Sequence, residues 1–247
     1  MKNYLTAFVM TQSMFCSIPC PWKKWEEKAR PYMLLFLPVI GLEIGILWVL
    51  LDTLLSHFAI PKLVCGLAMC ALPYLVTGFI HLDGFMDVTD AVCSWRDLER
   101  RRQILKDSHV GSFAVVWCVF LLIGGVVFFA SVPAEAPGMC LLFVPVVSRC
   151  CSAMAVLMLK PMSTSQYAQN MDTPKWHAAV LAILTLLCVA VGFIFWGKYG
   201  FVLLGGLAGY GLALRRSYRS LEGMNGDISG YCLTISELCA AAVLALL

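Results

Sequence analysis

The sequence predicts an all-α fold: a polytopic integral membrane bundle of about seven transmembrane helices, in one membrane-embedded domain spanning residues 1–247. Two observations predict this fold class. Of the 247 residues, 60% are hydrophobic and only 13% are charged, whereas a soluble domain usually carries about 25% charged residues. The apolar residues also fall into stretches of about 20, the length that an α-helix needs to cross a bilayer. The lipid bilayer is therefore the expected surrounding of this chain.

Seven stretches are long and apolar enough to be spans. We expect them at about 33–56, 62–81, 112–132, 139–159, 177–196, 199–215 and 229–247. The sixth is short and rich in glycine, which would let neighbouring helices approach closely. The longest polar stretch, 82–111, separates the second span from the third and is expected to be polar or amphipathic.

Basic residues gather in the segments that alternate threading places on one side of the membrane. The N-terminal stretch, 82–111, 160–176 and 215–228 hold five, five, two and three of them, which is 15 of the 18 lysines and arginines. By the positive-inside rule this side is expected to be cytoplasmic, with the N-terminus inside and the C-terminus outside. The net charge of +3 is small, and we expect no nucleic-acid partner. The sequence leaves a homo-oligomer open.

Three aspartates beside the second span carry the strongest functional signal. Asp83, Asp87 and Asp90 are spaced i, i+4 and i+7, so on a helix they fall within about 60° of one face. Carboxylates this close repel one another unless they share a cation. Mg²⁺ is typically held by a few carboxylates together with substrate phosphates and water. The row therefore predicts a site for one or two Mg²⁺ ions. The alternative is a solvated acidic face, but ionisable groups beside a membrane span favour function.

Two residues next to the row extend this candidate site. His81 could be a metal ligand, a base or a hydrogen-bond partner of a ligand carboxylate. Gly84 follows Asp83 and has no side chain, so it would let a substrate approach the backbone closely.

A second polar cluster precedes the third span. Lys106, Asp107 and Ser108 are followed by Gly111. A lysine, a hydroxyl and a glycine near a helix start could bind a phosphate. Alternatively, Asp107 or Ser108 could simply cap the following helix.

A third polar cluster precedes the last span. Asn225, Gly226 and Asp227 combine a turn signal with polar groups, and they are candidate substrate-binding residues. Asp227 could instead cap the last helix.

Three further ionisable residues are expected inside spans. Glu43 and Glu237 are candidate metal ligands, and Arg149 is a candidate phosphate ligand or internal counter-charge. Each has a structural alternative: the glutamates could close interhelical hydrogen bonds, and Arg149 could form an ion pair.

These motifs resemble the signatures of the cobalamin synthase family, the membrane-bound adenosylcobinamide-GDP ribazoletransferases. The segment Gly78-Phe-Ile-His81-Leu-Asp83-Gly84-Phe-Met-Asp87-Val-Thr-Asp90 is similar to the family pattern Gly-x-x-His-x-Asp-Gly-x-x-Asp-x-x-Asp. Lys106-Asp107-Ser108-His-Val-Gly111 is similar to Lys-Asp-Ser-x-x-Gly. Gly223-Met-Asn225-Gly226-Asp227-Ile-Ser-Gly230, with Glu237 after it, is similar to Gly-x-Thr-Gly-Asp-x-x-Gly followed by a glutamate. Asn225 departs from the usual Thr. The likeness covers essentially the whole chain, although 133–200 match only loosely.

The resemblance implies a reaction, a metal and a location. A hydroxyl of α-ribazole, or of its 5′-phosphate, would attack the cobinamide-linked phosphate of adenosylcobinamide-GDP. GMP would leave, and adenosylcobalamin or its 5′-phosphate would form. The family needs Mg²⁺. The implied location is a bacterial inner membrane, with the site facing the cytoplasm.

The resemblance also implies roles for individual residues. Asp83, Asp87 and Asp90 would hold Mg²⁺ against the diphosphate. Lys106 or Arg149 would offset charge on the leaving GMP. The proton of the attacking hydroxyl would pass to Asp87, Asp90 or His81.

Two rival functions are suggested by the residues. A CDP-alcohol phosphotransferase of phospholipid synthesis also has an aspartate-rich metal site, but its pattern needs Ala-Arg where this chain has Asp87-Val88. A divalent-cation transporter could use Asp83, Asp87, Glu43 and Glu237. Transporter sites lie near the bilayer midplane, often between repeats, whereas this chain shows no repeat and its aspartates are predicted at the membrane edge.

Overall fold

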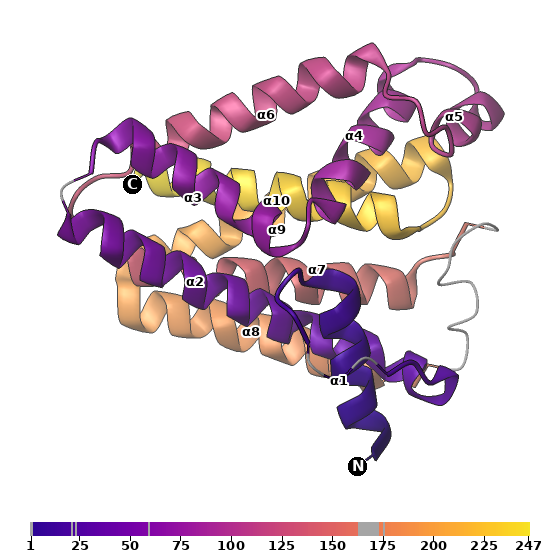
Figure 1. Ribbon diagram of the computed structural model, residues 1–247, viewed down its shortest axis with the longest axis horizontal. Coiled ribbons are helices and arrows are strands. Elements are labelled where there is room, and N and C mark those ends of the chain that lie inside the picture. Colours follow the sequence, from indigo (N-terminus) through magenta and orange to yellow (C-terminus); the bar gives the residue numbers. More distant parts are fainter. Residues whose placement is uncertain (1, 21, 23, 59, 163–172, 175) are drawn as a thin grey trace.

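The computed structural model describes the whole chain apart from residues 1, 21, 23, 59, 163–172 and 175. The described residues form helices and no β-strand, apart from one isolated bridge between Pro161 and Met224. Most long helices lie along the longest axis of the molecule, and α4 crosses them at a steep angle (Figure 1). The predicted all-α membrane bundle is confirmed.

Ten α-helices and three short 3₁₀-helices are described. In chain order they are α1 (Lys2–Phe15), η1 (Glu27–Phe36), α2 (Leu37–His57), α3 (Lys62–Val76), α4 (Ile80–Cys93), α5 (Leu98–Ile104), α6 (Ser112–Ala130), η2 (Gly138–Leu141), α7 (Val144–Met158), α8 (Trp176–Trp196), η4 (Gly197–Gly200), α9 (Phe201–Leu221) and α10 (Gly226–Leu246).

Three of the basic segments meet at one end of the bundle, which we call the basic end. It comprises residues 94–111, 159–162 and 222–225 (Figure 1). The Arg102 guanidinium donates hydrogen bonds to the backbone carbonyls of Leu221 and Glu222, at 2.9–3.0 Å. The Met224 N–H donates to the Lys160 carbonyl at 2.8 Å. Segments far apart in the sequence are thus joined at one end, as alternate threading predicts.

The other connections lie at the opposite end of the bundle. The turn at 197–200 is next to the end of α10, where the Lys198 ammonium donates to the Leu247 carbonyl. Gly138, which begins η2, packs against the Asp52 carboxylate of α2. Figure 1 shows these connections on the side of the molecule away from α5.

The number of spans depends on how bent and joined helices are counted. Five helical runs are long and apolar enough to cross a membrane, or six if the bent pair α3 and α4 counts as one span. One of the five, Trp176–Leu221, is 46 residues long, about 69 Å as a straight helix and more than twice the thickness of a hydrocarbon core. It contains both spans predicted at 177–196 and 199–215. Gly197 has a positive φ of 55°, and Figure 1 shows α8 and α9 running in opposite directions.

The second span, predicted at about 62–81, is interrupted in the structure. Helix α3 ends at Val76, and α4 begins at Ile80 after a bend of 94°. Gly78 and Phe79 between them have φ angles of 59° and 64°, a left-handed conformation that ends a right-handed helix. Residues 82–93 of the predicted polar stretch 82–111 therefore belong to the helix α4.

Helix α10 is the centre of the half of the bundle that carries the polar motifs. It packs against α4, α6, α7 and α9. One apolar cluster joins α10 to α4 and α9, and a second joins α1, η1, α2, α7 and α8. α4 and its aspartates are therefore held against a central buried helix.

Helices α2 and α7 touch through glycine. A Cβ atom on Gly45 would lie 2.0 Å from the Leu142 carbonyl oxygen, and one on Gly41 would lie 2.4 Å from the Pro145 carbonyl oxygen. These distances leave no room for a side chain, so both glycines permit close backbone approach.

We predict that Gly45→Ala lowers the thermal unfolding midpoint of the detergent-purified protein, because the new methyl group must push α2 away from η2 and α7. Overpacking of this kind costs about 1–3 kcal/mol. Gly211→Ala on α9 is the matched control, since a Cβ there meets nothing within 4 Å. It should leave the midpoint unchanged or raise it, because alanine favours helix. Equal midpoints for the two variants would contradict the packing.

Candidate active site

Helix α4 presents its three aspartates on one face, as predicted. Asp83 is exposed, and Asp87 and Asp90 are half-buried. The Asp87 carboxylate is within electrostatic range of Asp83 and Asp90, and also of Asp227 at the start of α10. The structure therefore adds a fourth carboxylate to the row. The sequence pointed to Asp227 as a substrate-binding or capping residue but gave no spacing that linked it to the row.

Asp227 is held by the residue that caps its helix. The Asn225 side-chain oxygen accepts a hydrogen bond from the Ile228 N–H at 2.9 Å, which makes Asn225 the N-cap of α10. The amide nitrogen of the same side chain donates to the Asp227 carboxylate at 2.7 Å. The alternative that Asp227 caps the helix is wrong. Gly226 is the first residue of α10 and leaves Asp227 on the first turn, beside α4.

Glycines bring α4 and α10 into backbone contact. A Cβ atom on Gly84 would lie 2.8 Å from the Asp227 carbonyl oxygen, and one on Gly230 would lie 3.1 Å from the backbone of His81. The Thr234 hydroxyl also donates to the His81 carbonyl at 3.3 Å. Gly84 was expected to make room for a substrate, but the structure shows that it makes room for α10.

The second motif reaches the row through its glycine. A Cβ atom on Gly111 would lie 2.0 Å from the Asp90 carboxylate, so Gly111 provides the space into which Asp90 projects. Gly111 is also the N-cap of α6 and makes no side-chain cap bond. The alternative that Asp107 or Ser108 caps this helix is therefore wrong.

The polar residues before Gly111 face water at the basic end. Lys106, Asp107 and Ser108 are exposed. The Asp107 carboxylate accepts a hydrogen bond from the His109 N–H at 3.0 Å and lies 2.7 Å from the His109 ring nitrogen. These bonds lower the pKa of Asp107 below its usual value, so it stays ionised at neutral pH. Lys106 and Ser108 are open to a ligand from solution.

Arg149 and Glu237 form a buried ion pair with each other. Arg149 is 1% exposed and Glu237 is 9% exposed. The Ser148 hydroxyl donates to the same Glu237 carboxylate at 3.3 Å. The ion pair is the structural alternative that the sequence left open for both residues. The Glu237 carboxylate binds Arg149 and is therefore not free to hold a metal. The Arg149 guanidinium is also within electrostatic range of His81, and its Nε and Nη2 atoms have no hydrogen-bond partner in the described structure.

Glu43 is likewise bonded inside the bundle. Its carboxylate accepts a hydrogen bond from the Gln12 amide at 3.0 Å and a weak one from the Cys16 thiol at 3.8 Å. The structure therefore places Glu43 beside α1, away from the aspartate row.

A cavity of about 560 Å³ lies beside Asp83. It is lined by the end of α1 and by the bend between α3 and α4, with Cys16, Ser17, Thr77 and Phe79 among its walls. Its size is within the 300–1,000 Å³ typical of ligand pockets. These lining residues were not predicted from the sequence, because α1 is distant from α4 in the chain and only tertiary packing brings the two helices together. The structure adds one local indication of function, the left-handed backbone of Phe79, since strained backbone gathers at functional sites.

The carboxylates suit a hard cation by their chemistry. Within the described residues, no lysine or arginine forms an ion pair with Asp83, Asp87, Asp90 or Asp227. The same part of the chain contains no group of three His, Cys, Asp or Glu side chains close enough to hold a metal by themselves. Mg²⁺ usually binds through one or two carboxylates plus phosphates and water, so the donor set fits a metal that arrives with a phosphate substrate.

Fold and site together define a multi-pass helical membrane protein whose polar motifs converge on a four-carboxylate site at one end of the bundle. A family model described as cobalamin-5-phosphate synthase matches residues 7–245. The chain belongs to this family.

Relatives named adenosylcobinamide-GDP ribazoletransferase match along the chain. The protein of Clostridium perfringens strain SM101 is 35% identical over 254 residues, which is 100% of both chains. That of Clostridium botulinum strain Alaska E43 is 31% identical, covering 96% of each chain. That of Desulfitobacterium hafniense strain Y51 is 33% identical, covering 82% of each. No solved structure matches the chain.

We predict that Asn225→Ala lowers the unfolding midpoint, because loss of an N-cap costs about 0.5–2 kcal/mol. Asn225→Ser keeps a capping oxygen but loses the amide that bonds Asp227, so it should keep most of the stability. Thermal unfolding in detergent measures the difference. If the two variants were equally destabilised, the contact to Asp227 and not the cap would hold this turn.

Proposed function

We propose that this protein transfers the adenosylcobinamide phosphate group from adenosylcobinamide-GDP to α-ribazole or its 5′-phosphate, releasing GMP. Family membership supports this function, as do the names of relatives that match the full chain. It is the first of the three functions that the sequence suggested. The observation that carries the proposal is the convergence of the three polar motifs on the carboxylates of α4.

The transfer exchanges one phosphorus–oxygen bond for another. The ribazole hydroxyl oxygen forms a bond to the cobinamide-linked phosphorus, and the bond from this phosphorus to the bridging oxygen breaks. GMP leaves with that oxygen and the bond electrons. The hydroxyl proton passes to a base of the site, for which Asp87, Asp90 and His81 are the candidates. Enzymes of phosphoryl transfer act mostly by positioning and by neutralising charge.

We propose Asp83, Asp87 and Asp90 as the residues that hold Mg²⁺, with Asp227 as an additional carboxylate. When bound, the metal would neutralise charge on the diphosphate. The mutual repulsion of the carboxylates supports this assignment, because a bound cation or proton would relieve it.

The chain's other residues would place the substrates around this centre. Lys106 and Ser108 are exposed at the basic end, where they would bind phosphate oxygens of the nucleotide. The cavity beside Asp83 would receive a substrate from the other side of the row. The Arg149–Glu237 pair is within electrostatic range of His81. It would hold the helices around His81 in place rather than bind phosphate.

We predict that Asp83→Ala lowers GMP release from adenosylcobinamide-GDP and α-ribazole by at least about 10²–10³-fold, the size of loss typical when one charge-stabilising group is removed. The measurement is GMP formed by purified protein, with Mg²⁺ and after its chelation. Chelation should abolish release from the wild type.

The matched control is Asp52→Ala, which removes a half-buried carboxylate at the opposite end of the bundle. This variant should keep its activity. GMP release by Asp83→Ala close to that of the wild type would refute the role of the aspartate row. GMP release by the wild type after chelation would refute the requirement for Mg²⁺.

We further propose that the basic end faces the cytoplasm of a bacterial cell, across its inner membrane. Three of the four segments that together hold 15 of the 18 basic residues meet at this end, and lysine and arginine concentrate in cytoplasmic loops. The two soluble substrates would then meet the site from the cytoplasm.

We predict that a reporter fused after Leu247 reports an external location, because the end of α10 lies opposite the basic end. A reporter in the connection 94–97 should report the cytoplasm. An alkaline phosphatase and green fluorescent protein pair measures both positions. A cytoplasmic C-terminus together with an external 94–97 connection would reverse the proposed orientation.

A further inference from the structure

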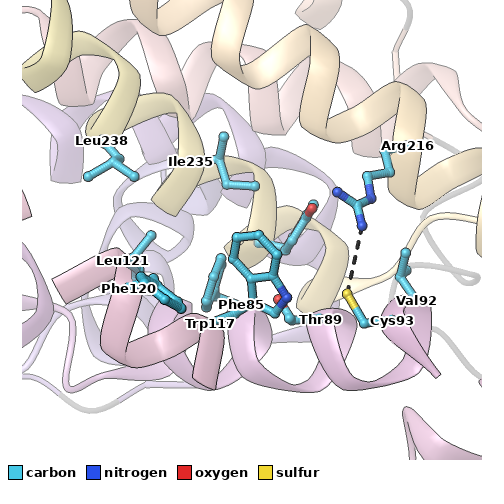
Figure 2. Close-up of a pocket in the computed structure, with 11 residues that line it drawn as sticks. Phe85, Thr89, Val92, Cys93, Trp117, Phe120, Leu121, Arg216, Ile235 and Leu238 are labelled. Carbon is cyan, nitrogen blue, oxygen red and sulfur yellow. Dashed lines mark hydrogen bonds between the residues drawn. The ribbon is translucent and has the colours of Figure 1, made fainter. Parts of the chain in front are cut away.

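A second cavity lies on the side of α4 away from the aspartates. It has a volume of about 210 Å³ and is lined by α4, α6, α9 and α10 (Figure 2). Helix α4 contributes Phe85, Thr89, Val92 and Cys93. At 100° per residue, Phe85 and Val92 lie opposite the aspartate row, and Thr89 and Cys93 lie to one side of it. The proposed function uses none of these side chains.

The walls of this cavity are mostly apolar, and Arg216 is the one charged residue among the described residues that form them. Its deeper walls include Leu121 from α6 and Ile235 and Leu238 from α10. Arg216 from α9 contributes the positive charge, and Figure 2 shows its guanidinium at the opposite side of the cavity from Leu121 and Leu238. A cavity with this composition suits a ligand that has one anionic end and a hydrocarbon body.

Arg216 has no acidic partner in the part of the chain that the structure describes. Its guanidinium makes a weak hydrogen bond to the Cys93 sulfur at 3.7 Å, and within the described residues it forms no ion pair. The side chain is exposed. An arginine in this state can bind phosphate oxygens through two parallel N–H donors.

The polarity of the cavity follows the axis of the bundle. Arg216 lies near the end of α9 that reaches the basic end, whereas Leu238 lies about 10 Å deeper along α10 than Tyr231, at 1.5 Å per residue. The charge is therefore at the membrane surface and the hydrocarbon walls are at membrane depth. A phospholipid has the same order of parts.

The cavity is open to lipid through α6. Trp117 and Phe120 form its outer wall and are 47% and 65% exposed, on a span with only 17% of its apolar window buried in the protein. These side chains face the bilayer. A lipid chain can thus reach the cavity without crossing water.

We propose that this cavity binds one anionic phospholipid, with the lipid phosphate on Arg216 and part of one acyl chain between α4, α6 and α10. Charge complementarity favours an anionic lipid, since basic pockets between helices on the cytoplasmic side bind anionic headgroups. The volume is below the 300–1,000 Å³ of typical ligand pockets, so it fits a narrow chain better than a nucleotide or a corrinoid. The bound chain supports α4 from behind the aspartate row.

The test measures lipid retained by detergent-purified, delipidated protein in native mass spectrometry. The protein is mixed with equal amounts of phosphatidylglycerol and phosphatidylcholine that carry the same acyl chains. The wild type should retain one phosphatidylglycerol in preference to phosphatidylcholine. Arg216→Gln should weaken this retention about fivefold or more, the effect of one arginine on an anionic lipid.

The matched control is Arg215→Gln, which removes the same charge from the adjacent, exposed position outside the cavity. It should retain phosphatidylglycerol as the wild type does. Leu238→Trp, which fills the deep end, should also lose the lipid while Arg216 is intact. The circular dichroism spectrum and size-exclusion elution of Leu238→Trp must match those of the wild type, which shows that the variant folds. If they do not match, the smaller substitution Leu238→Phe is used instead.

Three results would overturn the proposal. Equal retention of the two lipids by the wild type would show that charge does not select the ligand. Equal losses in the two arginine variants would show a diffuse surface effect. Retention of glycerol 3-phosphate as strong as that of phosphatidylglycerol would show a phosphate site that needs no acyl chain. Because the readout is lipid binding, it stands apart from any measurement of GMP release.

Discussion

The contact between α4 and α10 is the constraint on which the site depends. Gly84 and Gly230 let the two backbones touch, and the rings of Phe85 and Tyr231 stack beside them with their centroids 5.7 Å apart. Without this approach, Asp227 would not come within range of Asp87. Small residues at a helix interface are a common device in membranes, where lipid tails give apolar side chains little reason to associate and close packing must hold helices together.

The bundle separates two kinds of ionisable group. Arg149 and Glu237 are deeply buried and form an ion pair with each other, as expected at membrane depth, where isolated charges are costly. The four aspartates lie at the basic end, partly open to water, with no basic partner among the described residues. The first arrangement holds the interior together. The second leaves negative charge ready to receive a cation and a phosphate substrate.

Helix α4 connects three environments because of its steep angle. One face carries the aspartates, its start borders the cavity beside Asp83, and its other face lines the lipid-accessible cavity with Arg216. The left-handed residues Gly78 and Phe79 produce the turn that makes this possible. A straight second span would have directed the same residues along the bundle axis, away from α10.

The sequence by itself determined the fold class, the membrane setting, the aspartate row and the segregation of basic segments. These follow from composition and from spacing along single helices, which are local properties. It also singled out Asp107, Ser108 and Asp227, but it could not decide whether each caps a helix or binds a ligand. Those roles depend on which atoms lie across an interface.

Only the tertiary structure decided how the motifs combine. It showed that Asn225 and not Asp227 caps α10, that Arg149 pairs with Glu237, and that Glu43 bonds to Gln12. It also broke the second span at Gly78, a bend that hydropathy does not register because both arms are apolar enough to pass as one segment. The Arg149–Glu237 and Glu43–Gln12 contacts each join two different helices, so the packing of whole helices sets them and no pattern within a single segment encodes them.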